Sequence, residues 1–194
     1  MLIGSGGHAQ VLLETLLAHR TDVTVYGILD PNIERQGERI FGVSIIGDDS
    51  WLSTARDHGV THFVVGAGSI GDSSLRERLY KLGLSHSLIP LSVIHPGAYI
   101  SPRAIPGLGV QIMANAIINT NAQIGNNVII NTGSIVEHDC IIGDHVHIAS
   151  GACLTGQVHV GQGTHIGAGA TIRQSIKIGD YVIIGLGAGV VKDV

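Results

Sequence analysis

Cysteine and charged residues are scarce in this chain of 194 residues. Two cysteines, Cys140 and Cys153, do not make the disulfide framework of a small secreted protein and fit a reducing compartment. Charged residues make up 13 % of the chain and the net charge is −4, so no nucleic-acid partner is expected. No apolar run approaches the ~20 residues of a membrane span, and no signal peptide opens the chain. These absences predict a cytoplasmic protein without membrane insertion.

Glycine and aliphatic residues dominate instead. Apolar residues make up 44 % of the chain and glycine fills 28 positions, whereas aromatic residues contribute only 4 %. This composition is too apolar for a disordered chain and too poor in bulky side chains for a helical globule. It favours a protein built from strands and rich in small residues.

An aliphatic residue recurs every six positions through the second half of the chain, with a break only at Pro106. Four positions after each of these lies a second, mostly small residue, such as Ala98, Ala116 or Ala152. A period of six fits neither the turn of a helix nor the alternation of a free strand. The aliphatic series comprises Ile94, Ile100, Ile112, Ile118, Ile124, Ile130, Val136, Ile142, Ile148, Leu154, Val160, Ile166, Ile172, Ile178, Ile184 and Val190.

A triangular solenoid accounts for this period, because each hexapeptide can form one flat side and three of them close a coil. The aliphatic residue fills the interior, the small residue lies at the tight corner, and Gly or Asn takes the positive φ of the turn. Successive coils stack at the ~4.8 Å spacing of paired strands. The pattern resembles the left-handed β-helix acyltransferase superfamily over residues 94–194. That resemblance implies a homotrimer, with acetyl-CoA in the groove between neighbouring solenoids.

Several hexapeptides also carry an apolar residue at their sixth position, which is expected to point outward. A neighbouring solenoid packed on these side chains would explain them, and three-fold closure suits a triangular prism. A homotrimer is therefore expected on physical grounds as well. The residues are Ile117, Ile129, Ile135, Ile141 and Ile183.

Residues 1–88 have the alternation of a half-Rossmann domain. The first strand enters Gly4–His8, a Gly-rich turn of the kind that holds phosphate at a helix N-terminus. Asp30 follows the second strand, where an acid would meet a ribose hydroxyl. The expected strands are Met1–Ile3, Val23–Leu29 and Thr61–Val65, and the expected helices begin near Val11, Trp51 and Arg76.

The turn also matches the dinucleotide fingerprint Gly4-x-Gly6-x-x-Ala9, so an NAD-binding enzyme is an alternative. The domain has half the usual size and no second mononucleotide-binding half, which favours a single nucleoside diphosphate. We expect residues 1–88 to bind a nucleotide sugar and residues 89–194 to form the acyltransferase solenoid, with the linker around Pro90.

The two halves together are more specific than either alone. Gly-Ser-Gly-Gly-His, Leu-Asp-Pro and Val-Gly-Ala-Gly-Ser follow the three strands, and the hexapeptide region carries Glu-His-Asp. This combination resembles the bacterial sugar O-/N-acyltransferases, typified by the bacillosamine-pathway N-acetyltransferase. The resemblance implies acetylation of the C4 amine of a UDP-linked 4-amino-4,6-dideoxy sugar, while relatives act on GDP-perosamine or O-acetylate sialic acid. The matched motifs imply substrate contacts from Gly6, Gly7, His8, Asp30, Pro31, Gly68 and Asn131.

Acetyl transfer from a thioester to an amine needs a base, a donor for the oxyanion and two substrates held in contact. His138 lies third in its hexapeptide, away from the interior positions, and an imidazole suits a general base near neutral pH. A carboxylate at Asp139 could orient the ring and stabilise the imidazolium. By resemblance, His138 matches the family's base and Asp139 its acidic partner.

The partner acetyl-CoA is expected along the solenoid. Gly156 stands one coil after His138, and its N–H could bind the thioester carbonyl oxygen. The resemblance places His147 near the acetyl group, and Ala168 and Leu186 along the pantetheine arm. His147 and His165 are also one coil apart, so a functionless ladder of stacked imidazoles is the alternative for His147.

Three further expectations complete the hypothesis. Direct attack on acetyl-CoA is expected, because no Cys or Ser is placed as a nucleophile beside the base. A zinc carbonic anhydrase would use His138, His145, His147, His159 and His165, but a nucleotide domain would be idle in it, and no metal is expected. A sugar-nucleotide sensor without activity is the other alternative, because the chain lacks the Gly-x-Pro-Ala tail usual in this class.

Overall fold

The computed structural model describes residues 1–194, and their contacts divide them into two units. The first unit contains Met1–Gly68 and Arg78–Val93, and the second contains Ser69–Glu77 and Ile94–Val194. The predicted fold class, a half-Rossmann sheet followed by a left-handed parallel β-helix, is confirmed. No helix of the protein combines the length and the apolar character that a membrane-spanning segment needs.

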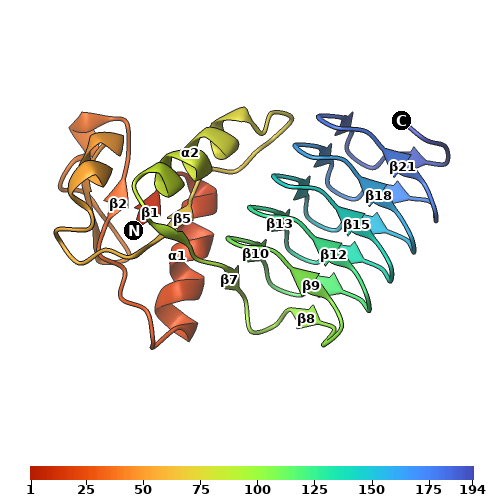
Figure 1. The fold of residues 1–194 in the computed structure, drawn as a ribbon, viewed down its shortest axis with the longest axis horizontal. Helices are drawn as coiled ribbons and strands as arrows, with labels where there is room; N and C mark the ends of the chain where they lie inside the picture. Colours follow the sequence, from red (N-terminus) through yellow and green to blue (C-terminus); the bar gives the residue numbers. More distant parts are fainter. The chain divides into compact units, whose positions relative to one another are not determined.

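The first unit is built on a six-stranded sheet with the order β3-β4-β2-β1-β5-β6 (Figure 1). All neighbouring strands are parallel except β3 and β4, which form an antiparallel hairpin. The two central strands, β1 and β2, are apolar and buried, as parallel strands covered on both faces must be. The strands are β1 (Leu2–Ile3), β2 (Ile28–Leu29), β3 (Arg39–Ile40), β4 (Val43–Gly47), β5 (His62–Val65) and β6 (Ile89–Pro90).

Helix α1 (Gly7–His19) follows the Gly-rich turn directly. Its apolar residues repeat at helical spacing, and Ala9, Leu12, Leu13 and Leu16 are buried. Two 3₁₀ helices, Ile33–Arg35 and Asp49–Thr54, and helix α2 (Ser74–Ser85) complete the helical elements.

The structure departs from the sequence expectations at four places in the first half. The hairpin β3–β4 was not predicted, and the segment from Trp51 forms a 3₁₀ helix and turns instead of an α-helix. Strand β2 is shorter than the expected Val23–Leu29, because its partner β1 offers only two paired residues. Ile89–Pro90, expected in the linker, pairs with β5 as an edge strand, a position that tolerates proline.

The second unit is a solenoid with three flat faces, and Figure 1 shows its coils stacked from green to blue. The first face holds β7 (Val93–Ile94), β10 (Gln111–Ile112), β13 (Ile129–Ile130), β16 (His147–Ile148), β19 (His165–Ile166) and β22 (Ile183–Ile184). The second face holds β8 (Tyr99–Ile100), β11 (Ile117–Ile118), β14 (Ile135–Val136), β17 (Cys153–Leu154), β20 (Thr171–Ile172) and β23 (Gly189–Val190). The third face holds β9 (Ile105–Pro106), β12 (Gln123–Ile124), β15 (Ile141–Ile142), β18 (His159–Val160) and β21 (Lys177–Ile178).

Three corners join these faces. We call the turn from the first face to the second the first corner, the turn from the second to the third the second corner, and the remaining turn the third corner. From Gly109 to Gly187 every sixth residue has a positive φ, which is why Gly and Asn recur there. The first and fifth hexapeptide positions, such as Ile118 and Ala116, form the buried core, as predicted.

The first face is covered within the chain itself. His147 Nδ1 lies 2.6 Å from the carbonyl oxygen of Ser69, and Arg76 Nε donates to the Asn127 carbonyl at 3.2 Å. Ile129 has no exposed surface. The expectation that a neighbouring solenoid packs on Ile129 is therefore wrong, whereas Ile183 on the same face is 60 % exposed. The stretch Ser69–Glu77, distant in sequence, covers the part of the face around His147.

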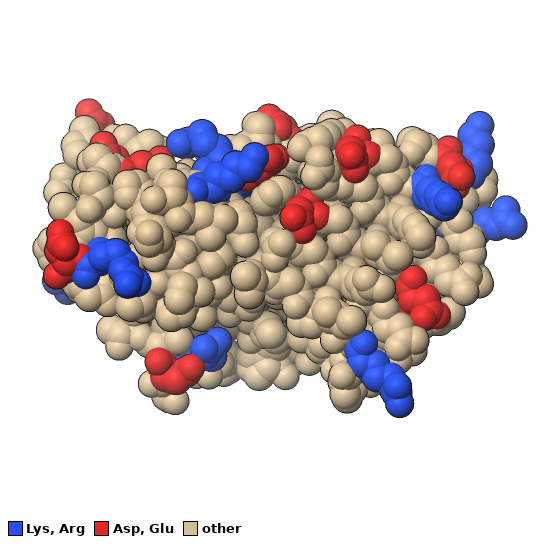
Figure 2. All heavy atoms as spheres, in the orientation of Figure 1, with Lys and Arg blue, Asp and Glu red and all other residues tan.

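Charged side chains are scattered over the surface. On the face shown in Figure 2, acidic and basic residues lie singly or as small mixed groups, with wide uncharged areas between them. The low charge content therefore gives no extended patch of one sign on this face.

Candidate active site

The second corner carries the candidate base. The His138 ring and the Asp139 carboxylate meet with His138 Nδ1 2.8 Å from Asp139 Oδ2, and each side chain is 44 % exposed. Because this contact leaves Nδ1 as the donor, Nε2 of a neutral His138 is the nitrogen with a free lone pair. Hydrogen bonds from His138 and then from Asn121 hold the pKa of Asp139 below its ordinary value. The pair can accept a proton at Nε2 and stabilise the resulting imidazolium.

Gly156 lies one coil further along the same corner, as the sequence predicted. A Cβ atom at this position would stand 2.6 Å from both Cε1 and Nε2 of His138, so the ring lies directly over the glycine. The Gly156 N–H takes no part in the backbone hydrogen bonds of the corner. A donor that is free and close to the base is suited to an oxyanion.

Three polar residues that the sequence analysis did not select support this corner. Asn119 Nδ2 donates to Glu137 Oε2 at 3.0 Å, and Asn121 Nδ2 donates to Asp139 Oδ1 at 3.0 Å. The signal that would have found the two asparagines is their spacing, since each lies one coil of 18 residues before its partner.

His147 lies on the first face, away from the second corner. It is 6 % exposed and meets the His165 ring edge to face, with centroids 4.9 Å apart and an interplanar angle of 71°, while burial lowers the pKa of His165. Its Nδ1 contacts the Ser69 carbonyl, so Nε2 is the acceptor for Asn131 Nδ2 at 3.2 Å. The two imidazoles one coil apart are thus in contact, but both are buried, and the hydrogen bonds are made by His147.

Asn131 begins the first corner, where Ala168 and Leu186 follow two and three coils later. Leu186 is 81 % exposed, so its corner is open to a ligand. Within one chain the whole second face separates these residues from His138 and Gly156. The structure therefore divides the predicted acetyl-CoA residues between two corners.

The Gly-rich turn brings together most of the predicted substrate residues. Gly6 is the N-cap of α1, and no side chain caps that terminus. A Cβ on Gly68 would lie 3.8 Å from the His8 Cβ, so the turns after β1 and β5 are neighbours. No atom would contact a Cβ at Gly6 or Gly7, which leaves open space above the helix N-terminus. Such a terminus can bind a phosphate group.

Asp30 and Pro31 follow β2 at the same edge of the sheet. Asp30 accepts hydrogen bonds from the Ser5 hydroxyl and from the Asn32 N–H, and it lies 3.2 Å from Arg35 Nη1. Burial raises the pKa of this carboxyl, but these three contacts together hold it below the ordinary value. Arg35 also donates to the Ser5 hydroxyl at 2.5 Å. This cation beside the Gly-rich turn could not be predicted, because the 3₁₀ helix that carries it has no regular sequence pattern.

The two cysteines do not offer a nucleophile. Cys140 is buried, its Sγ donates to the Thr155 carbonyl at 3.2 Å, and burial raises its pKa to about 11. Burial also raises the pKa of Cys153. A thiolate intermediate is therefore disfavoured.

No group of three or more His, Cys, Asp or Glu side chains in the chain is arranged to hold a metal ion.

Two family models match the chain, "PglD N-terminal domain" over residues 1–82 and "Bacterial transferase hexapeptide (six repeats)" over residues 121–156. PerB from Caulobacter crescentus, solved with CoA and GDP-perosamine, is 37 % identical over 100 % of this chain and 88 % of that one, with a TM-score of 0.91. The acetyltransferase domain of PglB from Neisseria gonorrhoeae, solved with acetyl coenzyme A, is 31 % identical over 100 % and 90 %, with a TM-score of 0.86.

The chain belongs to the sugar N-acetyltransferase family of hexapeptide-repeat proteins. The family resemblance stated from the sequence is confirmed, and the protein is an acyltransferase. WeeI from Acinetobacter baumannii, at 26 % identity over 100 % of this chain and 91 % of that one, has a TM-score of 0.85. The second corner of this sugar N-acetyltransferase holds a histidine–aspartate pair, and its first unit holds an open helix N-terminus.

Proposed function

We propose that the protein transfers an acetyl group from acetyl-CoA to the C4 amine of a nucleotide-linked 4-amino-4,6-dideoxy sugar, with His138 as the base. The observation that carries this proposal is the His138 ring, held by Asp139 with Nε2 above Gly156. The Caulobacter relative supports it, because that enzyme was solved with CoA and GDP-perosamine. Two histidine mutants of it hold the same two ligands.

In the proposed reaction, the sugar amine attacks the thioester carbonyl carbon directly. As the C–N bond forms, Nε2 of His138 takes the proton that the amine loses, and Asp139 stabilises the imidazolium. The carbonyl oxygen becomes an oxyanion, which accepts a hydrogen bond from the Gly156 N–H. The intermediate then collapses, the C–S bond breaks, and the imidazolium returns the proton to the departing sulfur.

The first unit is proposed to hold the nucleotide, in keeping with the expected division into a nucleotide-sugar-binding domain of residues 1–88 and a solenoid of residues 89–194. The diphosphate would lie over Gly6, Gly7 and His8 at the start of α1, where the helix dipole and free space favour an anion. Asp30 and Pro31 would contact the ribose, and Gly68 would line the same edge.

The nucleotide itself is open to two assignments. The bacillosamine-type resemblance favours UDP, whereas the Caulobacter relative was solved with GDP-perosamine. In both, the acceptor is an amine on a 4-amino-4,6-dideoxy sugar, so the proposed chemistry at His138 is the same.

A thiol-release assay tests the proposed function. Purified protein, acetyl-CoA and either a UDP-linked or a GDP-linked 4-amino-4,6-dideoxy sugar should release CoA thiol and give an acetamido product by mass spectrometry. The corresponding sugar with a C4 hydroxyl should release thiol much more slowly. If no amino-sugar nucleotide stimulates thiol release above the slow hydrolysis of acetyl-CoA, the proposal is wrong.

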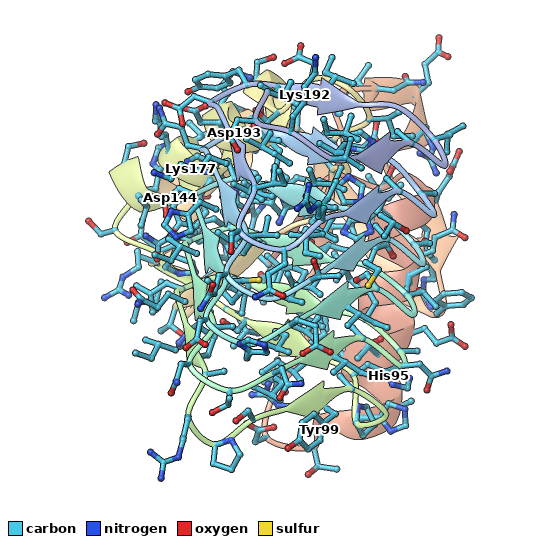
Figure 3. The ribbon with its side chains drawn as sticks, turned by 90° about the vertical axis from the view of Figure 1, so that its right-hand side faces the viewer. His95, Tyr99, Asp144, Lys177, Lys192 and Asp193 are labelled. Carbon is cyan, nitrogen blue, oxygen red and sulfur yellow. The ribbon has the colours of Figure 1, made fainter.

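We further propose a homotrimer whose sites lie between copies. Ala168 and Leu186 lie one coil apart on the first corner, where they can line the pantetheine arm, with Asn131 and His147 beside them. The second corner of a neighbouring copy would then supply His138 and Gly156. Three-fold closure would bring unlike corners together in this way at every boundary. Figure 3 shows Tyr99, on the second face, and Asp144, at the third corner, projecting from different sides of the coils.

The second face is the surface that we expect a neighbouring copy to cover. Its outward residues Tyr99, Ile117, Ile135 and Cys153 are apolar and exposed or half-buried, whereas the third face carries mainly polar residues around Ile141. Ile135→Glu should therefore convert the trimer to monomers in light scattering and reduce activity, because a charge would be desolvated in the interface. Ile141→Glu on the third face is the matched control and should stay trimeric. A wild-type monomer with full activity would contradict the assembly.

A further inference from the structure

The Asp139 carboxylate at the second corner is held by two side chains. The two oxygens of the Asp139 carboxylate have different partners, since Oδ2 contacts His138 Nδ1 at 2.8 Å and Oδ1 accepts from Asn121 Nδ2 at 3.0 Å. We propose that Asn121 is a positioning residue that acts through Asp139 to fix the orientation and the tautomer of the His138 ring. This inference rests on the proposed acetyl transfer.

A positioning residue is needed because the side chains of His138 and Asp139 are both exposed to solvent. Asp139 and His138 are each 44 % exposed, and an exposed ion pair contributes little by itself and leaves both side chains free to rotate. The Asp139 backbone is fixed, with a φ of 60° and its N–H bound to the Thr120 carbonyl at 3.0 Å. Only the plane of the Asp139 carboxylate is still free to rotate. A second hydrogen bond, donated by Asn121 to Oδ1, fixes that plane.

Asn121 is well placed for this task because it lies one coil before Asp139 and has nearly the same backbone conformation. Its φ is 58°, a left-handed value that Asn tolerates better than most residues, so its side chain projects beside that of Asp139. Asn119 makes the companion contact with Glu137, whose Oε2 also accepts from the His138 N–H at 3.3 Å. The preceding coil thus supports His138 on both its main chain and its ring.

An ordinary side-chain ladder is the competing explanation. Ser175 Oγ and Gln157 Oε1 form such a contact on the same corner at 3.1 Å, and Asn126 lies near Asp144 at the third corner. These contacts involve no candidate base. The contact from Asn121 differs because its acceptor is the carboxylate that orients His138, so only this contact should affect proton transfer.

The charged groups around His138 and Asp139 determine how the pKa of Asp139 should respond to a substitution at Asn121. His138 contributes most and Asn121 next to holding the pKa of Asp139 below its ordinary value, and Glu137 is the other ionisable carboxyl of this corner segment. Removing the Asn121 donor should therefore raise the Asp139 pKa. Replacing the donor with a carboxylate should also favour a protonated base, because the added negative charge stabilises the imidazolium.

The experiment compares Asn121→Gly, Asn121→Asp and the control Ser175→Ala. Glycine keeps the left-handed backbone without strain and removes only the donor. We expect Asn121→Gly to lower kcat roughly 10-fold, by analogy with the low end of the effect of removing an outer partner that orients a metal-bound histidine, with KM for both substrates within about twofold. We expect Asn121→Asp to move the acid limb of the kcat/KM profile to higher pH. Ser175→Ala should match the wild type in both measurements.

A measurement that does not depend on turnover accompanies the kinetics. The Asp139 carboxyl, followed by ¹³C NMR during a pH titration, should show a higher pKa in Asn121→Gly than in the wild type and Ser175→Ala. If an active wild type and both Asn121 variants share the kcat and pH profile of Ser175→Ala, Asn121 has no positioning role. If the wild type acetylates no amino-sugar nucleotide, the proposed function fails instead, and an unchanged Asp139 titration would then separately overturn the contact.

Discussion

Replacing His138 with Ala is expected to lower kcat by ~10²–10⁴, the usual contribution of a general acid–base group. The ring is half exposed and contributes nothing to the buried core of the solenoid, so the variant should fold and assemble like the wild type. KM should change little, since the proposed role of His138 is to move a proton and not to hold the nucleotide. Steady-state thiol release with a saturating amino-sugar nucleotide measures both parameters.

His159→Ala is the matched control for this variant. His159 is exposed on the neighbouring third face and makes no contact with Asp139. It should keep wild-type turnover, and added imidazole should partly restore the His138→Ala enzyme by supplying the missing base. Near-wild-type turnover of His138→Ala with an intact fold would remove the histidine from the mechanism.

The solenoid could be predicted from sequence because its contacts are local and periodic. Each hexapeptide has an inward aliphatic residue, an inward small residue and a residue that forms the turn. Ile118 and Ala116 therefore have the same environment as the corresponding residues of other coils. The stacking of Gly156 on His138 followed from the same period. The distance between Gly156 and the His138 ring could not be predicted from the period, because the orientation of the ring depends on Asp139 and Asn121 together.

The covering of the first face could not be predicted in this way. Ile129 and His147 have the outward position of their hexapeptides, and nothing in the local pattern distinguishes them from Ile117 on the second face. What buries His147 includes Ser69, a residue 78 positions away in the chain. Arg35 was missed for a related reason, because its contacts with Ser5 and Asp30 join three separate turns.

Gly156→Ala is expected to lower kcat by about 10²-fold, within the range lost when acid–base catalysis is impaired. The new Cβ would stand 2.6 Å from Cε1 and Nε2 of His138, so the ring must leave its place above residue 156 and its contact with Asp139. The backbone of Gly156 does not have a positive φ, so alanine fits the main chain and the fold should persist. Gly179→Ala is the control, because its Cβ would meet only ordinary contacts at 3.5 Å and beyond.

The double variant with both Gly156→Ala and His138→Ala shows whether the methyl group acts through the His138 ring or directly on the substrate. If the added methyl group damages catalysis only by displacing the His138 ring, it should cost almost nothing once that ring is absent. Gly156→Ala should then change kcat less than about twofold in the His138→Ala background, a strong departure from additivity of the kind found for residues that act as a unit. The alanine N–H remains available to the oxyanion in both backgrounds, so its contribution cancels from the comparison. Equal losses in both backgrounds would show that the methyl group blocks the acetyl group or the oxyanion itself, and Gly156 would then be a binding surface for the thioester and not merely the space that His138 requires.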